Sequence, residues 1–281
     1  MTELFANVNN IQLSYSIHGK DTGTPLILLH GFVMYKEFWI AQINDLSKHF
    51  KLITIDLRGC GKSDHPEESY GLLAMVDDIK GLMNHLEIEK AHIGGHSLGG
   101  MVAINFALKY PDRLSKLILI ATVPEFPSDQ AGLDMYKNSQ ISSYRAKLED
   151  AVSSFFDKMK PRFTRNFFKI MKSDVKRKFY DIFSTEDLIE LEEKGTSNEK
   201  DIINLANVMS EHKSLNKLEQ IKNETLILAG EKDKHTVKSS SLLMHEKIVN
   251  SRLEILPGAH FFPLENAPEV NKIIIDFLTQ A

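Results

Sequence analysis

The chain has 281 residues, of which 42% are hydrophobic and 26% are charged, and its formal net charge is −4 at pH 7. This profile is typical of a soluble globular domain with room for a sizeable insertion, and its slightly acidic balance argues against a nucleic-acid-binding protein. The single cysteine excludes an internal disulfide. The N-terminal residues lack the basic flank and apolar core of a signal peptide, and no apolar run is long enough to span a membrane. We therefore expect a cytoplasmic protein without membrane contact.

The first predicted element is a β-hairpin over residues 7–19, in which Asn9 and Asn10 separate two stretches of alternating apolar positions. Short Leu/Ile-rich runs follow, and each ends in polar residues or glycine, which is the pattern of parallel strands buried on both faces. These runs cover residues 25–31, 51–59, 91–95, 114–122, 224–230 and 252–258. Helical patterns lie between them, at residues 70–86, 98–111 and 270–277. This alternation predicts an α/β fold with a mostly parallel, doubly wound sheet.

The alternation stops between residues 123 and 222, where no convincing strand pattern occurs. We expect residues 1–122 and 223–281 to form the sheet domain. Residues 123–222 are predicted to form an all-helical insertion, or cap, at the C-terminal edge of the sheet, where ligands bind in open α/β sheets. Residues 159–183 place Phe, Ile and Met at helix-compatible spacing among Lys and Arg. This spacing predicts an amphipathic helix with its aromatic stripe on the pocket and its charges in water. Contact with an anionic membrane is the weaker alternative.

A glycine-rich motif separates the strand predicted at residues 91–95 from the helix that follows. Residues 95–99, Gly-His-Ser-Leu-Gly, have the form G-x-S-x-G in the strand–turn–helix context that this motif requires. A strand that turns directly into a helix holds Ser97 out at the top of the sheet, while Gly95 and Gly99 let neighbouring backbone approach. The positive end of the helix then faces whatever Ser97 attacks. The motif therefore predicts a nucleophilic serine.

The chain resembles the α/β-hydrolases with a helical cap over nearly its whole length. The resemblance is carried by five motifs in the family's order: LLHGF (28–32) for the oxyanion loop, DLRGCGKSD (56–64) for the loop after the next strand, GHSLGG (95–100) for the nucleophile elbow, AGEKD (229–233) for the strand end that carries the acid, and PGAHFFPLENAPEVNKIIIDFL (257–278) for the histidine loop and closing helix. The family often has glycine just before this histidine, where this chain has Ala259. The resemblance implies an α/β-hydrolase fold with an N-terminal antiparallel hairpin and an inserted cap.

A serine hydroxyl is a weak nucleophile at neutral pH, and it needs a base within hydrogen-bond reach that an acid orients. The order Ser…Asp…His expected for this fold is met by Ser97, Asp233 and His260. In these roles His260 takes the Ser97 proton and returns it to the leaving group, while Asp233 holds the imidazole tautomer. Glu231, two residues before Asp233, and Glu125, after the preceding strand, are alternatives for the acid.

The tetrahedral intermediate of such a reaction needs hydrogen-bond donors aimed at its oxygen. The resemblance implies that the backbone N–H groups of Phe32 and Leu98 form this oxyanion hole. Gly31 gives the loop its backbone shape beside the substrate, and His30 is expected to form hydrogen bonds within that loop. His96 either lines the substrate pocket or packs beneath the elbow.

No cluster of residues in the sequence has metal-ligand spacing, and we expect no cofactor. The sequence thus indicates a carboxylesterase- or lactonase-like serine hydrolase that cleaves a carboxylic ester, lactone or related activated carbonyl of a small, partly apolar molecule through an acyl-enzyme.

Two alternatives to this function remain open. The same triad serves carbon–carbon bond hydrolases and elimination enzymes, whose substrates usually carry a carboxylate, so that a buried arginine or lysine in the pocket favours them. A ligand receptor with slow or no turnover also retains the fold.

Overall fold

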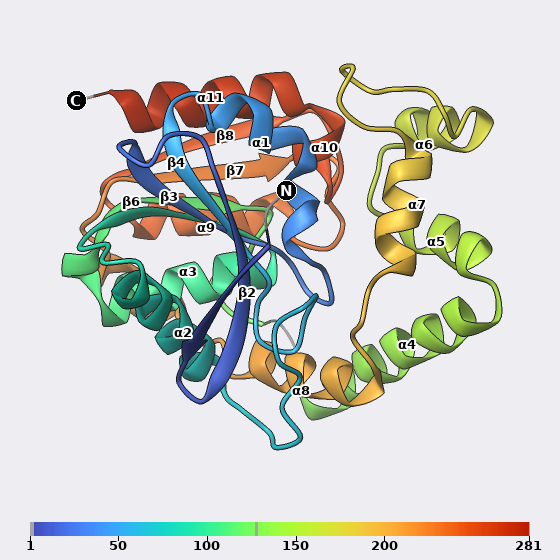
Figure 1. Cartoon of the computed structure of the whole chain (residues 1–281), viewed down its shortest axis with the longest axis horizontal. Helices are drawn as coiled ribbons and strands as arrows, with labels where there is room; N and C mark the ends of the chain where they lie inside the picture. The colour runs from blue at the N-terminus through green and yellow to red at the C-terminus, as the bar shows by residue number, and fades with distance from the viewer. Residues whose placement is uncertain (1–2, 127–128, 281) are drawn as a thin grey trace.

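The structure, a computed structural model, describes residues 3–126 and 129–280. Within these residues, eight strands form one sheet in the order β1-β2-β4-β3-β5-β6-β7-β8 (Figure 1). The strands are β1 (Leu4–Val8), β2 (Ile11–His18), β3 (Thr24–Leu29), β4 (Phe50–Ile55), β5 (Ala91–His96), β6 (Leu114–Ile120), β7 (Thr225–Gly230) and β8 (Ser251–Leu256). Each Leu/Ile-rich run of the sequence overlaps one of these strands, so that prediction is confirmed.

The antiparallel part of the sheet is confined to its N-terminal strands. β2 pairs antiparallel with both β1 and β4, and the pairs that join β4, β3, β5, β6, β7 and β8 are all parallel. Between β1 and β2, Asn9 and Asn10 have φ angles of 45° and 61°. A two-residue hairpin turn needs this left-handed backbone, which asparagine tolerates better than most residues. The predicted hairpin and the mostly parallel sheet are both confirmed.

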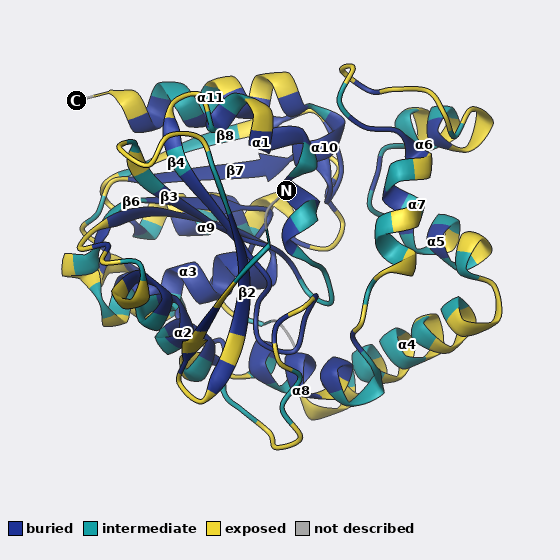
Figure 2. Ribbon diagram, in the orientation of Figure 1, coloured by how far each residue is buried: buried dark blue, intermediate teal, exposed yellow. Residues whose placement is uncertain are grey.

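Apolar side chains alternate between the two faces of the sheet along the central strands. In β3, Leu26 and Leu28 pack into one core cluster, while Ile27 and Leu29 pack into the other. Full burial of each such side chain is worth about 1.5–3 kcal/mol. Because both faces are covered, every position of these strands favours an apolar residue, which explains the continuous runs in the sequence. Figure 2 shows the central strands buried along most of their length.

Helices cover both faces of the sheet (Figure 1). One face is covered by α1 (Ile40–Leu46) and α11 (Ala267–Thr279), and the other by α2 (Leu72–His85), α3 (Leu98–Lys109) and α9 (Lys238–Lys247). Shorter elements are η1 (Lys36–Trp39), η2 (Pro111–Arg113) and α10 (Phe262–Glu265). In the described ranges, no helix combines a bilayer-spanning length with an apolar composition.

Between β6 and β7 the described residues form helices and add no strand to the sheet. These are α4 (Gln130–Glu149), α5 (Ala151–Met159), α6 (Arg165–Ser173), α7 (Thr185–Glu193), α8 (Glu199–Ser210) and the 3₁₀ helix η3 (Leu215–Gln220). Polar side chains accept hydrogen bonds from N-terminal backbone groups of α5, α6, α7 and α8, and these capping residues are Asp150, Thr164, Ser184 and Asn198. Such caps mark where each helix begins. Figure 1 shows α4 to α7 as an arm beside the sheet.

The prediction of one amphipathic helix over residues 159–183 is wrong. α5 ends at Met159, α6 covers Arg165–Ser173, and the chain then turns at Tyr180 and Asp181, whose φ angles are 55° and 56°. Two successive left-handed residues cannot continue a right-handed helix. The aromatic stripe forms part of the core, because neighbouring rings stack with centroids 4.5 to 5.5 Å apart in the order Phe163, Phe167, Phe179, Phe183.

Candidate active site

Ser97 lies at the sharp turn from β5 into α3. Its φ of 53° and ψ of −115° fall outside the regions that residues with a side chain readily adopt, so the turn is strained. The Ser97 N–H donates to the Ile120 carbonyl at 2.9 Å, and the Ser97 carbonyl accepts from the Gly100 N–H and the Thr122 hydroxyl at 2.9 and 2.8 Å. Because these neighbours hold the backbone, the strained turn keeps Ser97 at the carboxyl end of the parallel strands.

Two glycines around Ser97 are required by close backbone contacts. A Cβ atom on Gly95 would lie 2.1 Å from the Gly99 carbonyl oxygen, and a Cβ atom on Gly99 would lie 2.4 Å from the Leu29 carbonyl oxygen. Both distances are far below van der Waals contact, and backbone atoms packed in a sheet cannot move aside. The expectation that these glycines allow neighbouring backbone to approach is confirmed.

His260 and Asp233 meet at the same edge of the sheet, where they follow β8 and β7. The His260 Nδ1 and Asp233 Oδ2 atoms are 2.8 Å apart, and both side chains are buried. Burial disfavours the ionised carboxylate, but the His260 ring and hydrogen bonds from Thr236 outweigh it and hold the pKa of Asp233 below its usual value. Asp233 is thus ionised at neutral pH, and it accepts the Nδ1 proton of His260. This leaves Nε2 of His260 as the nitrogen that can accept a proton.

The two alternative acids lie apart from His260. Glu231 is exposed, and its backbone N–H pairs with Leu256 of β8. Glu125 is also exposed and forms an isolated bridge with Lys213. Across the described ranges, neither carboxylate forms a hydrogen bond or ion pair with His260. The geometry therefore favours Asp233 as the acid.

His96 connects the elbow to the histidine loop. Its ring is fully buried, its centroid is 4.7 Å from that of His260, and its Nε2 lies 3.0 Å from the His260 carbonyl oxygen. A carbonyl only accepts, so Nε2 carries the proton. Burial, reinforced by the neighbouring His260, keeps the pKa of His96 well below its usual value and the ring neutral. Of the two roles expected for His96, the structure shows packing beneath the elbow.

Among the residues that the structure describes, the Ser97 hydroxyl forms no hydrogen bond with the His260 ring, whereas His96, the residue before Ser97, contacts His260. Hydrogen bonds of this kind commonly become short only when a substrate is bound. The elbow and the histidine loop are nevertheless neighbours in space.

The loop after β3 is positioned by His30. The Leu57 N–H donates to His30 Nε2 at 3.0 Å, so Nδ1 carries the proton that it donates to the Gly31 carbonyl at 2.8 Å. Burial lowers the pKa of His30, which keeps the ring in the neutral form that these bonds require. As expected, His30 bonds within its own loop.

The two predicted oxyanion donors belong to the loop after β3 and to the first residue of α3. A Cβ atom on Gly31 would be 3.4 Å from Ser97 Cβ, so the loop that carries Gly31 and Phe32 passes directly beside the elbow. Leu98 is the first residue of α3, and the first N–H groups of a helix have no partner within it. Both backbone groups are therefore close to the serine.

Sequence reasoning missed two residues beside Asp233, because no motif in the chain marks them. The Thr236 hydroxyl lies 2.5 Å from Asp233 Oδ2 and 3.4 Å from His260 Nδ1. The exposed His235 ring stacks on the His260 ring with centroids 4.9 Å apart.

Possible metal ligands lie within 4.8 Å of one another at Asp233, His235 and His260. However, each Asp233 oxygen already accepts two protein hydrogen bonds, so the group fits proton transfer better than metal binding.

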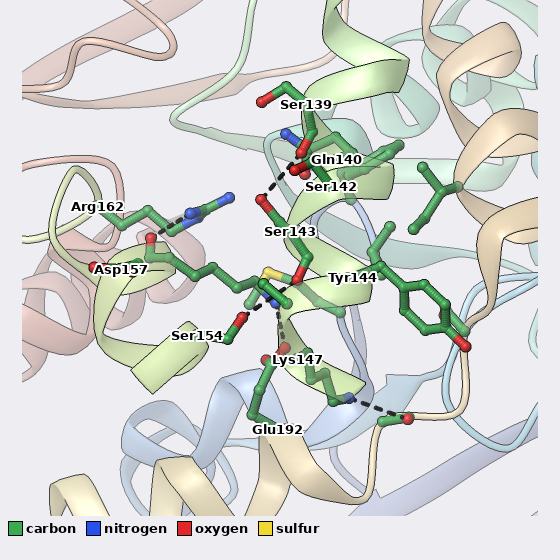
Figure 3. A pocket seen from close by; sticks show the side chains of 18 of the residues that line it. Ser139, Gln140, Ser142, Ser143, Tyr144, Lys147, Ser154, Asp157, Arg162 and Glu192 are labelled. Atoms are coloured by element: carbon green, nitrogen blue, oxygen red, sulfur yellow. Dashed lines mark hydrogen bonds and ion pairs between the residues drawn. The ribbon is translucent and has the colours of Figure 1, made fainter. Parts of the chain in front are cut away.

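A cavity of about 380 Å³ lies beside His235. Phe32 of the oxyanion loop and His235 form part of its wall, whereas Ser97 and His260 are not among its lining residues. Most of the remaining wall comes from α4, α5 and the residues around the end of α7. Figure 3 shows Ser139, Ser142 and Ser143 along α4, with the Arg162 side chain extending toward them. A cavity of this size accommodates a small molecule.

Comparisons with known proteins agree with this geometry. A family model described as alpha/beta hydrolase fold matches residues 24–267. A putative carbamate hydrolase of Agrobacterium fabrum is 38% identical over 112 residues, which are 38% of this chain and 42% of that protein. The alignments with the first curated relatives span less than two thirds of the relatives' lengths.

Two solved structures match nearly the whole chain. A hydrolase from Pseudomonas aeruginosa PA01 is 24% identical with a TM-score of 0.84, and the alignment covers 99% of each chain. A thermophilic esterase from Thermogutta terrifontis is 26% identical with a TM-score of 0.80, covering 99% of this chain and 98% of the esterase. The family model extends from the first parallel strand to the start of the last helix, and the chain belongs to the alpha/beta hydrolase fold family.

Proposed function

We propose that the chain is a serine hydrolase in which Ser97 is the nucleophile, His260 the general base and acid, and Asp233 the residue that orients His260. The observation that carries this proposal is the 2.8 Å contact between Asp233 Oδ2 and His260 Nδ1, at the sheet edge that also holds the strained Ser97. A buried carboxylate that binds Nδ1 leaves Nε2 free to take the proton of a hydroxyl, which activates the serine. The substrate is a carboxylic ester, lactone or related activated carbonyl of a small molecule.

The reaction has two halves. In the first, Ser97 Oγ attacks the carbonyl carbon as its proton moves to His260 Nε2, and the N–H groups of Phe32 and Leu98 donate to the oxyanion. The intermediate then releases an alcohol, which takes the proton from His260, and leaves an acyl-enzyme. In the second half, water attacks the acyl group and gives its proton to His260. The carboxylic acid leaves, and Ser97 recovers its proton.

The names of related proteins support attack at a carbonyl carbon. One relative is named a putative carbamate hydrolase, and one structural neighbour is an esterase. A carbamate and an ester both carry the scissile bond at a carbonyl carbon, so the mechanism above serves either substrate.

We further propose that residues 1–122 and 223–281 form the catalytic domain and that residues 123–222 form a cap. The chain leaves the sheet after β6 and returns to it at β7, and α4 and α5 of the intervening segment line the cavity beside His235. A substrate between cap and sheet edge is shielded from water, and movement of the cap would control its entry.

Turnover of short p-nitrophenyl esters tests the proposed function. We expect multiple turnover by the wild-type chain and a loss of about 10³-fold or more in kcat for Ser97→Ala, because the triad acts as a unit. A fluorophosphonate probe should label Ser97 in the wild type and not in the variant. Ser240→Ala, on α9, is the matched control and should keep full activity. A Ser97→Ala variant that retained most of the activity would exclude the covalent mechanism.

A further inference from the structure

The cavity contains a cation that has no carboxylate partner. Arg162 lies in the turn between α5 and α6 and lines the cavity. Throughout residues 3–126 and 129–280, no carboxylate oxygen lies within 4.0 Å of its guanidinium group. Its Nη1 donates to the Lys158 carbonyl, and its Cζ lies 5.7 Å from the centre of the Phe261 ring. A guanidinium group has five N–H donors, so most of them are left for another acceptor.

The other charges of the cavity largely cancel. Lys158 Nζ is 2.6 Å from Glu192 Oε1, and the two side chains are only 19% and 14% exposed. Lys147 donates to the Gly195 carbonyl, and Asp157 is exposed. The lining thus holds three cations, counting Lys147, Lys158 and Arg162, and two anions. A singly charged anion is the ligand that would neutralise the net positive charge of this lining.

Arg162 is also close to the candidate catalytic residues. Its backbone carbonyl accepts a hydrogen bond of 2.8 Å from the N–H of Phe261, the residue after His260. The same cavity is lined by Phe32 and by His235, whose ring stacks on His260. Figure 3 shows the Arg162 side chain extending toward the α4 serines. A small molecule that fills the cavity therefore contacts Arg162 as well as Phe32 of the oxyanion loop and His235, which stacks on His260.

We propose that Arg162 binds a carboxylate of the substrate, so that the substrate is a small ester or lactone that carries a separate, ionised carboxyl group. This inference rests on the proposed function. A pocket arginine also meets the condition set above for the carbon–carbon bond hydrolases and elimination enzymes, and turnover of simple esters distinguishes the proposed hydrolase from them. The planar fork of a guanidinium group binds both oxygens of a carboxylate, and Ser139 and Ser142 in the facing wall offer further donors. A phosphate dianion fits less well, since Asp157 and Glu192 in the same wall repel a second charge.

A matched pair of esters tests the carboxylate site. Mono-p-nitrophenyl adipate and p-nitrophenyl hexanoate have acyl chains of equal length and differ in a terminal carboxylate. We expect the wild type to prefer the adipate ester in kcat/KM, and Arg162→Gln to lower the ratio of the two kcat/KM values by about 10- to 100-fold, as for a lost hydrogen-bonded ion pair. Arg162→Lys should keep part of the preference. Lys160→Gln, an exposed lysine outside the cavity wall, is the control and should keep all of it.

Binding without hydrolysis separates this proposal from the proposed function. Calorimetry of adipate with Ser97→Ala should show binding that is lost when Arg162→Gln is added. If Arg162→Gln changes neither the ratio of the two kcat/KM values nor the binding of adipate, the proposed carboxylate site is wrong, while the proposed hydrolase function is unaffected. Adipate binding that depends on Arg162, without turnover of either ester, overturns the hydrolase and supports the site. If Arg162→Gln fails to fold, Arg162→Met, which keeps the packing on Phe261, replaces it in both measurements.

Discussion

At the scale of single residues, the candidate site depends on the groups that hold Asp233. Its two oxygens accept four hydrogen bonds, from the N–H groups of His235 and Thr236, the Thr236 hydroxyl and the His260 ring. This arrangement stabilises the ionised carboxylate inside the protein and fixes its direction toward Nδ1 of His260. The backbone donors cannot be removed by substitution, so the Thr236 hydroxyl is the contact that mutation can test.

We predict that Thr236→Val lowers kcat about 10-fold with little change in KM. The variant keeps the shape of the side chain but removes a hydrogen bond of 2.5 Å to a buried carboxylate. Such bonds to charged groups contribute about 1.5–3 kcal/mol, and their loss lets the imidazole leave its reactive orientation. Steady-state kinetics on a p-nitrophenyl ester measures the effect. Thr236→Ser retains the hydroxyl and should stay near wild type, whereas a Val variant with wild-type kcat would assign the hydroxyl a purely structural role.

At the scale of secondary-structure elements, the helical segment contacts the sheet domain through apolar packing and through polar links. Glu265, at the end of α10, accepts hydrogen bonds from the N–H and the hydroxyl of Thr164, and Tyr180 donates to the Glu265 carbonyl. At the other end, His65 Nδ1 lies 2.7 Å from Asp201 Oδ2 of α8. Thr164 lies close to Arg162 in sequence and Glu265 lies close to His260, so this link helps to place the cavity wall against the histidine loop.

Glu265→Gln should loosen this link without unfolding the protein. The substitution removes the negative charge and one of the two acceptor oxygens, which weakens the hydrogen bonds from Thr164. We expect faster hydrogen–deuterium exchange in residues 162–166 and unchanged exchange in the central strands, since local openings need not involve the whole fold. Glu269→Gln, an exposed position on α11, is the control. Equal exchange in both variants would contradict the proposed link.

At the scale of the whole molecule, buried histidines limit stability in acid. Burial lowers the pKa of His92 and of His212 to about 4, and these side chains are 6% and 0% exposed. In the unfolded chain the pKa of each ring would be about 6.5. Between these two values the unfolded chain binds more protons than the folded one. The stability that the neutral rings contribute is therefore complete above about pH 6.5 and is lost as the pH falls toward 4.

We predict that Tm falls continuously between pH 6.5 and 5. At pH 5, His92 and His212 should each take up about one proton on unfolding, in addition to the protons bound by His30 and His96, whose pKa values burial also lowers. Calorimetry in buffers of different ionisation enthalpy measures the total uptake. His212→Gln should reduce the uptake by about one proton, while His49→Gln, at an exposed position, should leave it unchanged. A Tm that does not change across this range would show that the rings stay neutral in both states.

The sequence by itself determined the class of fold and located the serine that we propose as the nucleophile. Apolar periodicity and turn chemistry are local properties, so the hairpin, the central strands and the flanking helices could be predicted from short windows. The G-x-S-x-G motif is equally local, because the turn from β5 into α3 lies within one short window and Gly95 contacts backbone only a few residues away. The single helix predicted over residues 159–183 failed for a related reason: helical spacing of apolar residues does not reveal the left-handed turn at Tyr180 and Asp181.

Only the tertiary structure decided which distant groups meet. The AGEKD motif favoured Asp233 and left Glu231 and Glu125 open, and only the structure shows that the loop after β7 brings Asp233 to His260. The sequence predicted that the charges of residues 159–183 lie in water. It could not show that Arg162 lines a cavity without a carboxylate beside it, because the residues around a side chain come from distant parts of the chain. The physical reason is that a site of this kind is an arrangement of loop ends at one sheet edge, and the distances between them are set by the packing of the whole sheet.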